Sequence, residues 1–319
     1  MPLTARAERE LSELISSPIG QTVHYAPVRD QEQHRQPLAT SGFALAAAIA
    51  LTLVAVIIQL HPTPAHATPL PLQFHPMNVS SKELLTTLSN KISAIPETSN
   101  EQPIIRIQTW NMVITDAGEE TTPTAIIVPG QLQVVRHRDG SLTNEMRTGQ
   151  PVNAAGNPIA GDADTPPIGT LLWSATFTAE QLVFPTPAPT TAQAMGNFLR
   201  QAIPENTPTN SGEYFRVITA LLREQDLTSE QNSALLQFLA SRTDIEVAGS
   251  VTDRLGRDGV AIRATRYWFE DAIHEYLIFD PNTGQIIATE TVDQNVEHLQ
   301  GLTGPTVTGY HAWERNQTK

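Results

Sequence analysis

The chain has 319 residues, a formal net charge of −13 and no cysteine. The lack of cysteine excludes a disulfide framework, a thiolate zinc site, a cysteine nucleophile and a lipid-modified N-terminal cysteine. The acidic balance argues against a nucleic-acid partner, because phosphate binding requires a clustered basic surface.

An apolar segment, residues 42–60, is predicted to be a transmembrane helix. It contains nineteen uncharged residues, which as a helix would cover roughly 28 Å, close to the thickness of the hydrocarbon core of a bilayer. The alternative is a signal peptide cleaved after Ala67, since Ala65-His66-Ala67 has the A-x-A pattern of a cleavage site. The 41 residues before the segment, and its length, favour a retained anchor with the lipid bilayer as its partner.

Basic residues near the apolar segment predict its orientation. Arg29 and Arg35 precede it, whereas residues 61–81 contain no lysine or arginine, although Asp30 and Glu32 weaken the contrast. By the positive-inside rule, residues 1–41 form a cytoplasmic head and the rest of the chain is extracytoplasmic. We therefore expect a single-pass protein of the cell membrane.

The head carries one amphipathic pattern. Apolar residues recur at helical spacing at Leu3, Ala7, Leu11, Leu14 and Ile15. A helix this short is marginal alone, so a cytoplasmic protein partner would stabilise it. A membrane-surface helix and a frayed tail are the alternatives.

Residues 61–79 are predicted to form an extended stalk. Five prolines lie within residues 61–76, and such a composition keeps a chain extended and semi-rigid. The stalk histidines His61, His66 and His75 lack a scaffold that would make them converge, so we do not expect metal binding there.

Residues 80–319 are expected to form one extracytoplasmic α+β domain, with a curved antiparallel sheet and helices packed on one face. A capping box at Ser80 and Glu83 predicts a helix that ends at Pro96, and Asp139-Gly140 predicts a hairpin. Strands are predicted at 104–115, 124–128, 131–138, 142–147, 170–178, 245–252, 260–269, 273–279 and 285–292, and further helices at 191–203, 212–225 and 229–242, with a long loop at 149–169.

No motif for a common hydrolase or nucleotide enzyme is present in the sequence. The paired carboxylates Glu119-Glu120 and Glu270-Asp271 are expected in solvated turns, and core packing is the expected role of the strand aromatics. We therefore predict no catalytic, cofactor-binding or metal-binding residue. The remaining candidates for chemistry are His137, His274, His298 and His311, and the aromatic residues are Trp110, Trp173, Tyr267, Trp268 and Trp313.

Residues 214–292 carry a resemblance to a known family. The most specific pieces are TDRLGRDGVA at 252–261 and FDPNTG at 279–284, with weaker likeness over 182–202. They resemble an actinobacterial family of membrane-anchored proteins of unknown function, often encoded beside extracytoplasmic-function sigma factors. An excess of arginine over lysine, 17 to 3, agrees with such a source. The chain lacks the His-x3-Cys-x2-Cys pattern of zinc-binding anti-sigma heads, and its order of elements is remotely similar to the half-barrels of lipoprotein carriers, which cradle acyl chains.

These observations lead to three hypotheses about function. The first is a non-catalytic envelope protein that senses or binds outside the cell and is linked to sigma-factor regulation through its head. The second is a carrier or receptor for a lipid or another apolar ligand. An anchored hydrolase is the third.

Overall fold

The computed structural model describes residues 69–96, 104–115, 124–152, 158–161, 166–268, 270–296 and 304–314. The predicted head, the predicted span at 42–60 and the first part of the stalk lie outside these residues. Within the described ranges no helix is long and apolar enough to cross a membrane.

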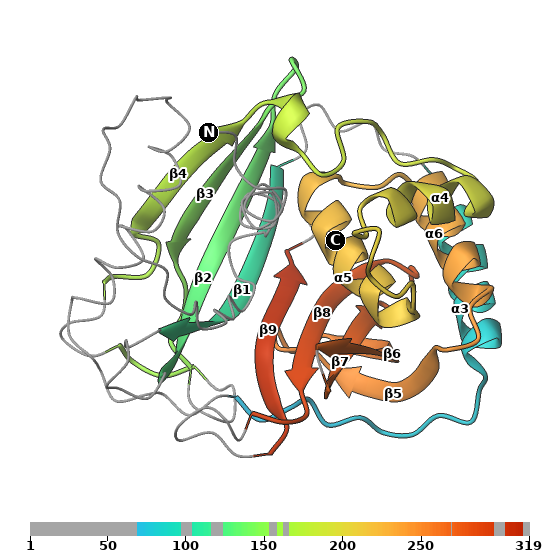
Figure 1. Ribbon diagram of the computed structural model, residues 1–319. Coiled ribbons are helices and arrows are strands. Elements are labelled where there is room, and N and C mark those ends of the chain that lie inside the picture. The colour runs from blue at the N-terminus through green and yellow to red at the C-terminus, as the bar shows by residue number, and fades with distance from the viewer. Residues whose placement is uncertain are drawn as a thin grey trace, which may run out of the picture.

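One open antiparallel sheet of nine strands organises the fold (Figure 1). The strand order is β4-β3-β2-β1-β9-β8-β7-β6-β5. The first four strands run outward from the centre of the sheet to one edge, and the last five return from the other edge, so that β9 pairs with β1 in the middle. The strands are β1 Ile104–Thr115, β2 Thr124–Arg136, β3 Leu142–Thr148, β4 Leu171–Phe177, β5 Glu246–Thr252, β6 Asp258–Trp268, β7 Asp271–Phe279, β8 Ile286–Asp293 and β9 Thr306–Trp313.

The helices gather at the β5 to β9 half of the sheet, and three of them connect its two edges (Figure 1). Helix α5 packs on β6 and β7, whereas α3 and α4 pack on α6. The face of the sheet that α5 covers is called the helix side below. The helices are α3 Ser81–Ser93, α4 Ala192–Gln201, α5 Ser211–Glu224 and α6 Ser229–Ala240, and a short 3-10 helix, η1, spans Ala179–Gln181.

Side-chain caps explain where the helices begin. Ser80 accepts a hydrogen bond from the backbone N–H of Glu83, and Asn210 caps α5 in the same way. At α6 the predicted capping box is complete, because Thr228 and Gln231 bond to each other's backbone N–H. These bonds satisfy N–H groups that have no partner inside the helix.

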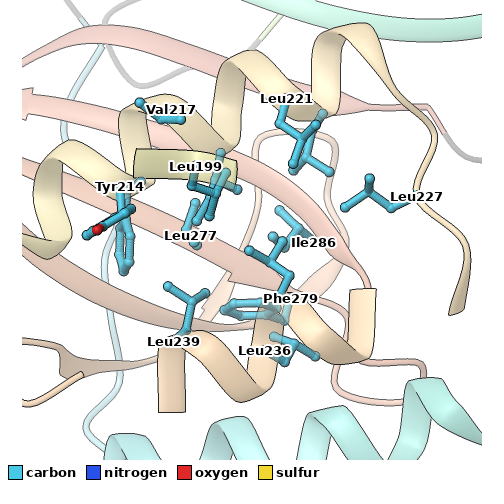
Figure 2. Packing of buried hydrophobic residues seen from close by; sticks show 14 of the residues in the cluster. Leu199, Tyr214, Val217, Leu221, Leu227, Leu236, Leu239, Leu277, Phe279 and Ile286 are labelled. Atoms are coloured by element: carbon cyan, nitrogen blue, oxygen red, sulfur yellow. The ribbon is translucent and has the colours of Figure 1, made fainter. Parts of the chain in front are cut away.

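The main core lies between the helices and the sheet. Leu221 of α5, Leu235 of α6 and Leu277 of β7 are fully buried there. Figure 2 shows neighbouring side chains from α4, α5, α6, β7 and β8 converging on the same space. Apolar burial at roughly 25 cal/mol per Å² makes this core the main source of stability.

A segment that we call the strap, residues 69–79, lies against the opposite side of the sheet. His75 forms a two-way backbone bridge with Ser250 of β5, with N···O distances of 2.8 and 2.9 Å. The ring of Phe74 stacks on Tyr276 of β7 at 4.8 Å. The strap is the last part of the predicted stalk, and it lies against the domain because its apolar side chains have a sheet surface on which to pack.

The predicted α+β class and the antiparallel sheet are confirmed, and two details differ. The predicted strands at 124–128 and 131–138 are one strand, β2, which continues through Pro129 and Gly130. Strand β9 was not predicted, although it occupies the centre of the sheet. The sheet is open, since β4 and β5 are its two edges.

Candidate functional site

The structure does not bring the predicted candidates together. His137 lies at the exposed β2–β3 hairpin and hydrogen-bonds to Thr143, and His274 is on β7. Glu119, Glu120 and His298 lie outside the described residues. Among the residues with described positions, no group of three or more histidine, aspartate or glutamate side chains is arranged to hold a metal ion.

The aromatic candidates fall into two groups. Trp110 and Trp313 are buried and Trp173 packs at the edge of the main core, as predicted for core aromatics. Tyr267 and Trp268 instead remain 63% and 43% exposed at the end of β6. The prediction of core packing therefore fails for these two, which are the last residues of β6, next to the β6–β7 turn.

Polar residues form a row across the centre of the sheet on the helix side. Thr109 of β1 is paired with His311 of β9, which is paired with Thr289 of β8. Trp313 lies two residues after His311 in β9, so the two side chains face the same side of the sheet. The Trp313 indole donates a hydrogen bond to the Leu222 carbonyl of α5, which identifies that side as the helix side. We call Thr109, His311 and Thr289 the helix-side row.

Arg223 of α5 brings a buried positive charge to this row. Its side chain is only 7% exposed, and it forms no ion pair with another described residue. Burial lowers the pKa of Arg223 to about 10, because the low-dielectric surroundings disfavour the charged form. The group still carries its proton near neutral pH.

Glu224 follows Arg223 in α5, and its negative charge acts on Arg223. The Glu224 carboxylate is nevertheless hydrogen-bonded to other groups. Its two carboxylate oxygens accept hydrogen bonds from the backbone N–H groups of Val183 and Phe184 at 3.1 and 2.8 Å. The free energy cost of burying Arg223 is therefore only partly offset. At the other end of α5, Arg266 is fully matched by Glu275, with Nε and Oε1 2.7 Å apart.

His311 is neutral beside this charge. Burial lowers the pKa of His311 to about 3, and the positive charge of Arg223 acts in the same direction. A neutral imidazole has one donor nitrogen and one acceptor nitrogen. Arg223 thus adds a cationic group near a row that consists of a neutral hydrogen-bonding ring and the hydroxyl-bearing residues Thr109 and Thr289.

A second polar row lies directly behind the first, on the side of the strap. It consists of Trp110, Tyr310 and Glu290, which are paired across β1, β9 and β8 and are called the strap-side row. Arg254, from the β5–β6 turn, forms an ion pair with Glu290 at 2.7 Å, in which the two side chains are 6% and 0% exposed. Its guanidinium also covers the rings of Trp110 and Tyr310 at 4.9 and 5.8 Å.

This ion pair holds the strap. Glu290 accepts a hydrogen bond from the Leu72 backbone N–H at 3.1 Å, and Arg254 donates one to the Leu70 carbonyl at 2.8 Å. Burial raises the pKa of Glu290, while Arg254 opposes that rise by favouring the charged carboxylate. We call Arg254, Glu290 and the strap backbone the latch.

The TDRLGRDGVA motif supplies one half of the latch. Asp253 accepts hydrogen bonds from the backbone N–H groups of Leu255 and Arg257 and pairs with the Arg257 side chain at 2.6 Å. Arg257 then donates to the carbonyls of Trp313 and Ile287. The turn is thereby fixed on β8 and β9, and Arg254 is held over Glu290.

Two hollows in the part of the surface that the structure describes lie apart from these rows. One of about 400 Å³ lies between α4, α5 and α6 and includes Gly196, Tyr214 and Phe238. The other, of about 350 Å³, includes Asp244 and Arg263. Neither contains a residue of the two rows, and neither gathers a set of reactive groups.

Sequence reasoning missed Arg223, Arg254 and Glu290. An arginine on an amphipathic helix or in a turn is ordinarily solvated, and so is a glutamate on a strand. The identity of these residues therefore does not indicate that they are buried. The one available signal was the turn motif at 252–261, whose two arginines and aspartate were interpreted only as turn residues.

Comparisons with known families, with curated proteins and with solved structures find no match to this chain. The resemblance to an actinobacterial family therefore stays a prediction. The two rows and the latch are the features of the molecule from which a function can be inferred.

Proposed function

We propose that this chain is a non-catalytic, membrane-anchored envelope protein whose extracytoplasmic domain binds a ligand and senses its presence. Residues 42–60 are the anchor, and residues 1–41 are the cytoplasmic head. The observation that supports the proposal is the latch. It binds the strap, which follows the proposed anchor in the chain, to the sheet strands that contain the helix-side row.

The short connection between anchor and latch supports a position close to the membrane. Only residues 61–68 separate the proposed anchor from the strap. Eight extended residues span at most about 29 Å. The domain would then remain near the bilayer surface with a fixed point of attachment.

The two rows support sensing, because they share the same three strands. Tyr310 of the strap-side row and His311 of the helix-side row are consecutive, as are Glu290 and Thr289. A change of backbone position caused by a ligand on the helix side would therefore reach the latch without crossing any loop. Packed strands transmit such shifts because a close-packed interior does not deform freely.

Three buried carboxylates of the sheet and its β5–β6 turn support binding in preference to catalysis. The carboxylates of Asp253, Glu275 and Glu290 each accept bonds from an arginine and from a further N–H or O–H group. A general acid or base needs a free position toward a substrate. These carboxylates instead fix the sheet and the strap.

A carrier for an apolar ligand is less well supported. Such a carrier needs a cleft between sheet and helices, whereas Leu277, Phe279 and Ile286 of the sheet lie in a space filled by helix side chains (Figure 2). Of this alternative, only a receptor role is retained, in which the ligand contacts the helix-side row.

A reporter fusion tests the topology on which the proposal depends. A reporter that is active only outside the cytoplasm is fused after Lys319, and the size of the mature chain is measured in the same cells. We expect external activity on a full-length chain that detergent, but not high salt, extracts from membranes. Activity of a cytoplasmic reporter, or a soluble product beginning after Ala67, would contradict the anchored sensor.

The proposed link to sigma-factor regulation requires a separate experiment. The full chain and a variant lacking residues 1–41 are purified from native membranes, and bound proteins and transcript levels are compared. We expect a partner and a transcriptional response that depend on the head. Identical partners and transcripts in the two samples would remove signalling from the proposal.

A further inference from the structure

The hollow of about 350 Å³ lies where β5 begins, and Glu246, Arg263 and Thr265 are among the residues that line it. Strand β5 begins at Glu246, which is paired with Arg263, whereas β6 continues to Trp268, past the last pair that the structure describes between these two strands. Gly212 allows the start of α5 to lie against the Thr265 backbone, with which a Cβ atom at Gly212 would collide. The hollow has the size of a site for a small molecule.

The carboxylates of this hollow are paired with arginines and remain partly exposed. Asp244 pairs with Arg242 at 3.4 Å and accepts hydrogen bonds from the backbone N–H and the hydroxyl group of Ser211 at 2.7 and 2.6 Å. Glu246 pairs with Arg263 across the two strands. The side chains of Asp244 and Glu246 are 41% and 68% exposed. Because a carboxylate can accept about four hydrogen bonds, both groups are held in place and can still accept bonds from a ligand.

Tyr267 provides an exposed aromatic ring at the border of the same hollow. Arg263, Thr265 and Tyr267 alternate along β6, so their side chains share one side of the sheet. Tyr267 is 63% exposed, and its partner across the strands, Ala272, is too small to cover its ring. The hollow therefore has fixed hydrogen-bonding groups beside an aromatic surface, a combination that binds ligands with both apolar and polar faces.

We infer that this hollow binds one pyranose ring of a neutral saccharide, with a C–H face of the ring against Tyr267 and hydroxyl groups bonded to Asp244, Glu246 and Arg263. A hydroxyl group donates and accepts, so one sugar can donate to both carboxylates and accept from the guanidinium. A charged ligand is disfavoured, because each carboxylate already has its arginine and an added charge would have no counter-ion. This inference goes beyond the proposed function, since the hollow lies apart from the two rows.

The probe is methyl β-D-glucopyranoside, whose ring substituents are all equatorial, so that both faces of the ring carry only C–H groups. It is compared with sorbitol, which has hydroxyl groups but no ring, and with the corresponding glucuronide, which has the same ring and a negative charge. Saturation-transfer NMR measures binding to the full chain in lipid nanodiscs, at equal ionic strength. We expect the glucoside to bind with saturation strongest on the axial protons of one face, the glucuronide to bind more weakly, and sorbitol not to bind.

Two results would overturn the inference. The first is equal saturation of the glucoside and sorbitol, or none of the glucoside, because the ring would then not be recognised. The second is tighter binding of the glucuronide than of the glucoside, because the ligand would then not be neutral.

Variants of the two aromatic residues at the end of β6 test the stacking contact. Tyr267→Ala should raise the dissociation constant of the glucoside about fivefold or more, because the stacked surface is lost, whereas Tyr267→Phe keeps the ring and should bind like the wild type. Trp268→Ala is the matched control, since Trp268 is also exposed, at 43%, but faces the opposite side of β6 and does not line the hollow. If Trp268→Ala weakens binding as much as Tyr267→Ala, or if Tyr267→Ala binds normally, the inference is wrong.

A further variant tests the hydrogen-bonding half of the hollow. Glu246→Gln should raise the dissociation constant about threefold or more, because a charge-assisted hydrogen bond becomes a neutral one. Its exposed ion pair contributes little to stability, so the midpoint of thermal unfolding should not change. Glu145→Gln is the matched control, since Glu145 also pairs with an arginine, Arg147, at 2.9 Å, but lies on β3. Normal binding by Glu246→Gln would refute the assigned hydroxyl contact.

These tests are independent of the topology experiment. Failure of the glucoside to bind would refute the saccharide site but would leave an anchored, externally exposed domain. A cytoplasmic location of the domain would refute the proposed function but would leave a measured saccharide site in place.

Discussion

Tyr310 and His311 are neighbours in β9, yet their side chains lie in different environments on opposite sides of the sheet. Tyr310 contacts Trp110 and Arg254 on the strap side, whereas His311 lies beside Arg223 and Trp313 on the helix side. Alternation along a strand produces this arrangement. One strand thus carries a residue of the helix-side row and a residue of the strap-side row.

The latch should behave as a buried ion pair. Glu290→Gln leaves the Arg254 charge buried without a counter-ion and should lower the free energy of unfolding by about 3 kcal/mol or more. The double variant Arg254→Met, Glu290→Met should be more stable than Glu290→Gln, because no isolated charge remains. Urea denaturation of the full chain measures both effects. If the double variant is less stable than Glu290→Gln, the prediction is wrong, and the attraction between Arg254 and Glu290 exceeds the cost of burying the two charges.

The hydroxyl group of Tyr310 should be dispensable for stability. It is buried without a hydrogen-bond partner among the residues that the structure describes. Tyr310→Phe removes this unsatisfied group and should raise the free energy of unfolding by about 1 kcal/mol. Tyr276→Phe is the matched control, since its hydroxyl is hydrogen-bonded to Arg263, and it should be destabilising. A clear loss of stability in Tyr310→Phe would indicate that a buried water bonds to the hydroxyl.

Most of the elements could be predicted because their signals are local. The bounds of β1 were predicted without error, and α6 was predicted from a capping box, Thr228 to Gln231, that the structure shows complete. Strand β9 could not be predicted in the same way. Gly309 interrupts its apolar alternation, and its place is set by pairing with β1 and β8, which lie elsewhere in the chain.

The candidate site was not predictable for a related reason. Whether an arginine is solvated or buried depends on what the fold places over it, and the helix pattern around Arg223 shows only that it lies beside an apolar stripe. Glu290 likewise reads as an exposed residue of an alternating strand. Both acquire their roles only when the strap and α5 cover the two sides of the sheet.

Gly249 should control the attachment of the strap. It has a φ of 133°, and a side chain there would collide with the backbone of His75. Gly249→Ala should therefore lower the free energy of unfolding by more than about 2 kcal/mol and expose the strap to protease. Gly256→Ala is the control, since Gly256 has a φ of 76° but nothing within 4 Å of its Cβ position. It should cost about 1 kcal/mol and leave the strap protected. Equal protease sensitivity of the two variants would contradict this account of the strap.

His311 should make stability depend on pH. An unfolded histidine has a pKa of about 6.5, whereas burial lowers the pKa of His311 in the folded protein to about 3. Between these values the unfolded state binds a proton that the folded state does not. The free energy of unfolding should thus fall as the pH falls through this range, by up to about 1.4 kcal/mol per pH unit.

The contribution of His311 to the pH dependence of stability is measured by comparing a variant that lacks it with the wild type. His311→Asn should show a shallower loss of stability than the wild type between about pH 6.5 and 4, as measured by urea denaturation at each pH. Parallel curves for His311→Asn and the wild type would show that His311 takes up a proton in the folded state at an ordinary pH.

The central claim is that the latch fixes the strap, and with it the proposed anchor, to the sheet. Hydrogen exchange at the backbone N–H groups of Leu72 and His75, both bonded to the sheet, measures this directly in the full chain reconstituted in lipid nanodiscs. Both groups should exchange slowly in the wild type, and the double variant Arg254→Met, Glu290→Met should exchange faster at Leu72, whose N–H then has no carboxylate to bond to. Equal exchange at Leu72 in the wild type and in the double variant would contradict the claim.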